Sequence, residues 1–196
     1  HRHAQLWSLI AFFLGFPLLL AIPLYEVSAA GQFIDAYLDI VSTVTTTGLP
    51  VFAPGSLSET LVIWRVSLGW ASGFLIWVFA WSIFAPLNLG GFEHLGARGE
   101  AMTQTQNARQ TTGRLPAEKF WSEAVRLGPV YLWITLAAAL ALLIVSGDPS
   151  YALLRAMATI ATFGIEIPEH SGAGGVGGEV ILALVMLFAL SRSTFS

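Results

Sequence analysis

The sequence predicts an all-α membrane protein in which one arrangement of helices occurs twice. Hydrophobic residues make up 55% of the 196 residues and charged residues only 11%, whereas a soluble domain carries about 25% charged residues. Two short segments, "FIDAYLDIVSTVTTTGL" at 33–49 and "YALLRAMATIATFGI" at 151–165, each end in threonine, one further residue, glycine and an apolar residue. Composition therefore predicts the class, and the paired segments indicate the repeat.

Three apolar runs, at residues 6–25, 61–86 and 130–146, are long enough to cross a bilayer, which takes about 20 residues. A fourth run at 180–190 is shorter, and spans only if its helix continues to the end of the sequence. The glycine run "GAGGVGG" at 172–178 lacks the lysine of a phosphate-binding loop and is interpreted as an extracellular linker.

The basic residues predict the orientation. Four of them lie in the polar loop at 88–119, and none lies at 26–59. Because loops rich in Lys and Arg stay in the cytoplasm, we expect a multi-pass protein whose N-terminus and polar loop are cytoplasmic. Both threonine–glycine segments then face the outside.

Each threonine–glycine segment begins as a helix too short to cross a membrane. The apolar residues of 33–44 recur at helical spacing. Asp148 and Pro149 are suited to the N-cap and first turn of the second short helix. A shift of about 116 residues lays Gly164 on Gly48 and Thr162 on Thr46, which predicts a tandem repeat. The predicted order is span, short helix, turn and span, twice over.

The turns have the composition of an ion pathway. Backbone that is not helical is tolerated at membrane depth only where protein buries it or where it lines a watery cavity. A turn there can aim carbonyl oxygens at a dehydrated cation, and the helix before it contributes the negative end of its dipole. Glycine permits the backbone angles required, and threonine hydroxyls can add ligands or brace the helix. A single such turn is common in loops, so the pair carries the prediction.

These segments resemble the Trk/Ktr/HKT superfamily of potassium transporters, and the Trk-type potassium uptake membrane subunit most closely. The resemblance rests on the segment at 33–49, "WRVSLGWASG" at 64–73, "LNLGGFE" at 87–93 and "GDPSYALLRAMATIATFGI" at 147–165. It implies repeats of outer helix, re-entrant pore helix, filter loop and inner helix around one pore in the cell (inner) membrane. The implied function is potassium uptake, driven by the membrane potential or by ion coupling. No enzymatic activity, cofactor or nucleic acid is expected, and potassium is the transported ion.

The resemblance also implies which residues line the filter with their backbone carbonyls. They are Thr46, Thr47, Gly48, Leu49, Thr162, Phe163, Gly164 and Ile165. In the family, glycine at the position of Gly48 accompanies potassium selectivity. Two departures from the family pattern are the large Phe163 and the Ser72-Gly73 pair, where two glycines are common.

The predicted organisation is a first repeat at 1–86, a cytoplasmic linker at 87–120 and a second repeat at 121–196. By the same shift, Ser196 corresponds to Ala80, so the last helix is expected to be cut short. Members of the family have four repeats, so we expect two further repeats or a second copy of the chain, as in a homodimer, to complete the pore.

The resemblance adds a cytoplasmic nucleotide-binding ring as a regulatory partner. The alternative function is a non-conducting scaffold or regulatory subunit, which Phe163 and the two repeats motivate.

Arg65 is the remaining candidate, because it lies inside an apolar run. One interpretation is that its long side chain reaches the outer interface near Glu59. The other is that it braces the filter or the pore helix, since an ionisable residue within a span is presumed functional.

Overall fold

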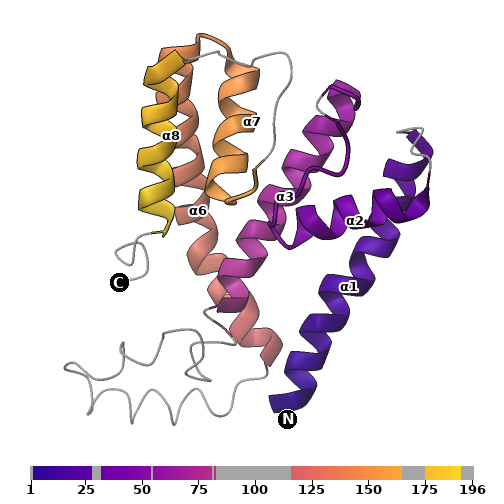
Figure 1. Ribbon diagram of the computed structural model, residues 1–196. Coiled ribbons are helices and arrows are strands. Elements are labelled where there is room, and N and C mark those ends of the chain that lie inside the picture. Colours follow the sequence, from indigo (N-terminus) through magenta and orange to yellow (C-terminus); the bar gives the residue numbers. More distant parts are fainter. Residues whose placement is uncertain are drawn as a thin grey trace, which may run out of the picture. The chain divides into compact units, whose positions relative to one another are not determined.

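The computed structural model describes residues 2–27, 32–53, 55–80, 82, 116–164 and 175–190. These residues form helices and connecting turns, with no strand among them (Figure 1). Three helices are long and apolar enough to cross a membrane: α1 (Arg2–Val27), α3 (Glu59–Phe79) and α6 (Pro116–Ser146). The prediction of an all-α membrane protein is confirmed at this level.

The long helices differ from the predicted runs at their ends. α6 begins at Pro116, well before the run predicted at 130–146, and continues through Pro129. The predicted linker at 87–120 lies outside the described residues, except for its last five, which begin α6. The run at 130–146 is predicted from apolar residues alone. It therefore leaves out the first turns of α6, which are polar but also helical.

The two short helices are α2 (Phe33–Val44) and α7 (Pro149–Ile160), each of 12 residues. α7 begins and ends 116 residues after α2. The predicted cap is confirmed, because Asp148 Oδ1 accepts hydrogen bonds from the backbone N–H groups of Ser150 and Tyr151 at 2.8 and 3.1 Å.

The last helix, α8 (Gly175–Leu190), begins 116 residues after the start of α3. The linker predicted at 172–178 is therefore wrong from Gly175 onward. α8 packs against α7, and Gly178 is buried. A Cβ on Gly177 would lie 3.3 Å from Val145 of α6, so the small residues of the run allow a close helix contact. Packing outweighs the low helix propensity of glycine here.

The described residues up to Gly73, together with those from Trp133 onward, form one compact unit. In this unit α2 packs against α1 and α3 through a cluster that includes Leu24, Ile40 and Leu61 (Figure 1). A second cluster joins α6, α7 and α8 through Leu142, Ala156 and partly buried residues of α8. The turns that follow α2 and α7 belong to this unit.

The described residues between Phe74 and Leu132 form a second unit. Its helical segments pack through aromatic rings. The ring centroids of Trp77 and Tyr131 are 5.2 Å apart, and those of Phe79 and Phe120 are 5.3 Å apart. None of the predicted filter residues lies in this unit.

Candidate functional site

The first candidate turn follows α2 directly. The backbone N–H of Thr45 donates to Val41 O at 2.9 Å, that of Thr46 to Thr43 O at 3.1 Å, and that of Thr47 to Ser42 O at 2.9 Å. Thr46 has a φ of 54°, in the left-handed region. Residues other than glycine are uncommon there, so the surrounding hydrogen bonds hold this conformation.

The turn after α7 has the same hydrogen bonds, each 116 residues downstream. Ala161 donates to Met157 O at 3.2 Å, Thr162 to Thr159 O at 3.0 Å, and Phe163 to Ala158 O at 2.9 Å. Thr162 has a φ of 55°, the counterpart of Thr46. The two turns therefore share one local backbone structure.

The glycines of the two turns differ. Gly48 has a φ of 70°, whereas Gly164 is not in the left-handed region. The sequence predicts that glycine supplies unusual backbone angles in both turns, and the structure confirms this only for Gly48. The left-handed threonines were missed, because nothing in a threonine run indicates a positive φ.

The two turns meet at their glycines. A Cβ built on Gly48 would lie 2.6 Å from Gly164 N, 3.1 Å from its O and 3.2 Å from its Cα. Glycine at position 48 is thus required for the two backbones to approach this closely. The structure brings the first turn, which contains Thr46, Thr47, Gly48 and Leu49, next to the second, which contains Thr162, Phe163 and Gly164; Ile165 lies outside the described residues.

Five carbonyl oxygens of the two turns accept no hydrogen bond from the described residues, whereas Leu49 O accepts one from Ser42 Oγ at 3.3 Å. Among the described residues, no hydrogen bond ends on the backbone oxygens of Thr46, Thr47 and Gly48, or on those of Thr162 and Phe163. Thr47 and Thr162 are exposed, and Thr46 and Gly48 are partly buried, so these carbonyl oxygens can be reached from outside the protein. Unpaired carbonyls on two adjacent turns are the oxygen ligands that a dehydrated cation requires.

Hydroxyl groups stabilise the first turn. Ser42 Oγ accepts a hydrogen bond from Leu49 N at 2.6 Å and donates one to Leu49 O at 3.3 Å. Thr43 and Thr45 donate to the carbonyls of Asp39 and Val41 one helical turn earlier, at 2.9 and 2.7 Å. Threonine hydroxyls thus brace α2, one of the two roles that the sequence left open. Ser42 was missed, because its partner Leu49 lies beyond the end of α2, where the helical period no longer indicates which residues meet.

Arg65 lies in the interior of the first unit. It is 7% exposed, and its Nη2 is 2.7 Å from Oδ1 of the fully buried Asp39 on α2. Glu59, the partner named from the sequence, is exposed. Among the described residues, Asp39 Oδ2 and Arg65 Nε have no hydrogen-bond partner. The sequence contains a signal that could have identified Asp39 as the partner of Arg65. Asp39 is an acidic residue next to Ile40, on the buried face of a short helix.

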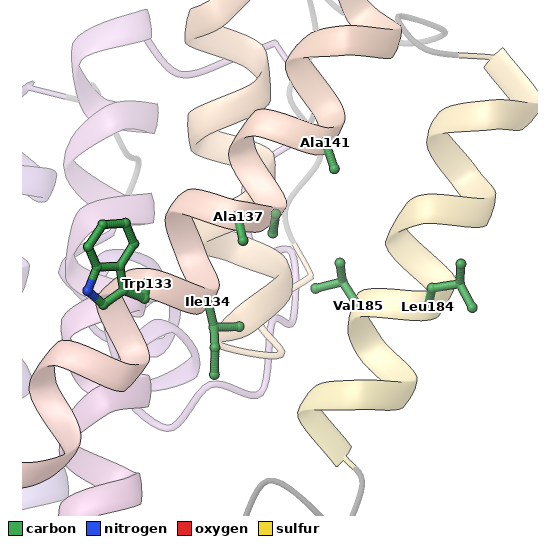
Figure 2. Close-up of a pocket in the computed structure, with 7 residues that line it drawn as sticks. Trp133, Ile134, Ala137, Ala141, Leu184 and Val185 are labelled. Atoms are coloured by element: carbon green, nitrogen blue, oxygen red, sulfur yellow. The ribbon is translucent and has the colours of Figure 1, made fainter.

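An apolar groove of about 470 Å³ lies between α6 and α8 (Figure 2). It is lined by Trp133, Ile134, Ala137, Ala138, Ala141, Leu184 and Val185. Ala141 and Val185 face the space between the two helices in Figure 2. The residues that line this groove include no carboxylate or other charged group.

Comparison with known proteins finds a distant similarity. The chain is 27% identical over 185 residues to the Trk system potassium uptake protein TrkI of Halomonas elongata. The match covers 94% of this chain and 34% of that protein, so the chain spans about a third of the length of this relative. No protein-family model matches the chain. No solved structure matches it either. The similarity is to a potassium uptake protein of the Trk type.

Proposed function

We propose that this chain forms part of a potassium-selective pore for potassium uptake across the cell membrane. One observation carries the proposal: two turns with the same hydrogen bonds meet at Gly48 and Gly164 with unpaired carbonyl oxygens. The similarity to a Trk potassium uptake protein supports the same ion and direction.

In this proposal the carbonyls of residues 46–49 and 162–165 replace the hydration shell of K⁺. Both α2 and α7 end at the turns, so the negative ends of their dipoles stabilise a cation there. No proton transfer or bond cleavage is required of the protein. The membrane potential supplies about 2.3 kcal/mol per charge per 100 mV, and ion coupling is the other energy source that the family resemblance implies.

We further infer a repeat of outer helix, re-entrant pore helix, filter loop and inner helix. α1, α2 and α3 form the first copy, and α6, α7 and α8 the second. The 116-residue spacing of helix starts and of turn hydrogen bonds supports this. A potassium filter surrounds the ion with four strands of carbonyls. Further repeats, or a second copy of the chain, supply the other two strands.

The orientation and partners belong to the same proposal. The basic loop at 88–119 supports an N-terminus in the cytoplasm and turns that face the outside of the inner membrane. A cytoplasmic nucleotide-binding ring is the regulatory partner that the family resemblance implies. The buried pair of Arg65 and Asp39 braces α2, and through it the first turn.

Uptake by the complete protein tests this function. The protein is expressed in a bacterial strain that lacks its own potassium transporters, and growth is measured in low external potassium. We expect growth at potassium concentrations that do not support the empty strain. Membrane insertion without growth or uptake favours the non-conducting scaffold.

A further inference from the structure

The side chain of Phe163 is directed into the protein, onto the backbone of α3. It is 2% exposed and belongs to a cluster with Val62 and Val66 of α3. A Cβ on Gly69 would lie 2.9 Å from Phe163 Cδ1 and 3.2 Å from Cγ and Cε1. The ring therefore occupies the volume that any side chain at position 69 would take.

The ring belongs to a residue whose backbone is among the candidate ion ligands. Phe163 N–H donates to Ala158 O at 2.9 Å, and the next residue is Gly164, whose backbone meets Gly48. One peptide unit therefore separates the residue that carries the ring from the contact between the two turns. The contacts thus lead from Gly69 on α3, through Phe163, to the meeting point of the two turns.

The two turns are stabilised in different ways. In the first, the Ser42 hydroxyl bonds to both backbone groups of Leu49. The residue 116 positions later is Ala158, which has no hydroxyl. In the second turn, the buried ring of Phe163 takes the place of that tether. The residue at the equivalent position of the first turn, Thr47, is exposed.

We propose that Phe163 and Gly69 are positioning residues that fix the second turn against α3, so that the choice between K⁺ and Na⁺ depends on the combined volume of these two residues. The proposal rests on the potassium conduction proposed above. The Phe163 ring and Gly69 are not ligands of the ion in this proposal; they act through the backbone of residues 163 and 164. This role would explain why a large side chain stands at position 163, where the family pattern has a smaller one.

The test uses the complete protein and the ratio of K⁺ to Na⁺ uptake per inserted molecule. Gly69→Ala places a methyl group against the ring, and we expect the ratio to fall about threefold or more as the carbonyls shift. Gly15→Ala on α1 is the matched control, because it is also a helical glycine and a Cβ there meets nothing within 4 Å. It is expected to leave the ratio unchanged.

A compensating variant separates positioning from general damage. Gly69→Ala with Phe163→Leu adds the methyl group and removes part of the ring, so the ratio is expected to return toward the wild-type value. Phe163→Leu alone loosens the turn and lowers the ratio, which also tests the proposal if Gly69→Ala does not insert. An unchanged ratio in both single variants, or a double variant no better than Gly69→Ala, overturns the proposal. Wild-type protein that inserts but takes up no potassium refutes the proposed function itself, and the positioning role with it.

Discussion

At the scale of single residues, Gly48 is the most constrained position of the candidate site. It combines a φ of 70° with backbone contact to Gly164. A left-handed backbone costs a side chain about 1–2 kcal/mol, and here an added Cβ must also displace the second turn. Substitution at Gly48 should therefore alter the geometry of both turns.

Gly48→Ser is expected to weaken the discrimination of K⁺ over Na⁺, because the new side chain pushes on Gly164. Reversal potentials in mixed salt measure this in the complete protein. Gly147→Ser is the matched control, since Gly147 has a φ of 71° but a Cβ there meets nothing within 4 Å. Equal reversal potentials for the wild type and Gly48→Ser would remove Gly48 from the filter.

Ser42→Ala is expected to loosen the first turn, because Leu49 loses both of its hydrogen bonds to the hydroxyl. A hydrogen bond within a protein contributes about 0.5–1.5 kcal/mol net, and Leu49 is 61% exposed, so that water replaces part of the loss. The midpoint of thermal unfolding in detergent should fall slightly and the apparent affinity for potassium should weaken.

The control is Ser67→Ala. Ser67 donates to Ile63 O at 2.8 Å on the exposed side of α3, and a surface change of this kind stays within about 0.5 kcal/mol. If the two alanine variants unfold at the same temperature and transport alike, Ser42 has no role in holding the turn.

At the scale of elements, the buried pair of Asp39 and Arg65 joins α2 to α3. Removing one member of a buried ion pair leaves an uncompensated charge, which costs about 3–5 kcal/mol. Asp39→Asn and Arg65→Gln are each expected to lower the free energy of unfolding by this order, measured with denaturant in detergent.

The double variant Asp39→Asn with Arg65→Gln removes both charges and should be more stable than the sum of the single losses predicts. Arg126→Gln serves as the control, because its pair with Glu123 is 3.6 Å long and its side chain is 71% exposed. Such pairs contribute about 0–1 kcal/mol. Simple addition of the two single effects would show that the pair does not couple α2 to α3.

The helices were more predictable from the sequence than their contacts. The bounds of α2 follow from its apolar period, and the start of α7 from Asp148-Pro149. The starts of α6 and α8 were missed, because apolar runs do not mark polar or glycine-rich helix ends. The turns were located by their glycines, whereas Asp39, Ser42 and Gly69 contribute through contacts between segments distant in sequence, which a local pattern does not contain.

At the scale of the whole molecule, the proposal requires both turns to face the outside. The sequence contains no cysteine, so a single introduced cysteine reports its own side of the membrane. Ser56→Cys, at an exposed position between α2 and α3, is expected to react with an impermeant thiol reagent from outside. Gln106→Cys in the basic loop should react only from the cytoplasm. If Ser56→Cys reacts only from the cytoplasm and Gln106→Cys only from outside, the two turns face the cytoplasm and the proposed orientation is excluded.

In the proposed function, the turns at Gly48 and Gly164 form part of a potassium filter. Ion flux into vesicles that contain only the purified complete protein tests it most directly, because no other transporter contributes. With an inside-negative potential and equal external K⁺ and Na⁺, K⁺ influx is expected to exceed Na⁺ influx, with a smaller difference for Gly48→Ser. Correctly inserted wild-type protein that passes neither ion, or both equally, would contradict it.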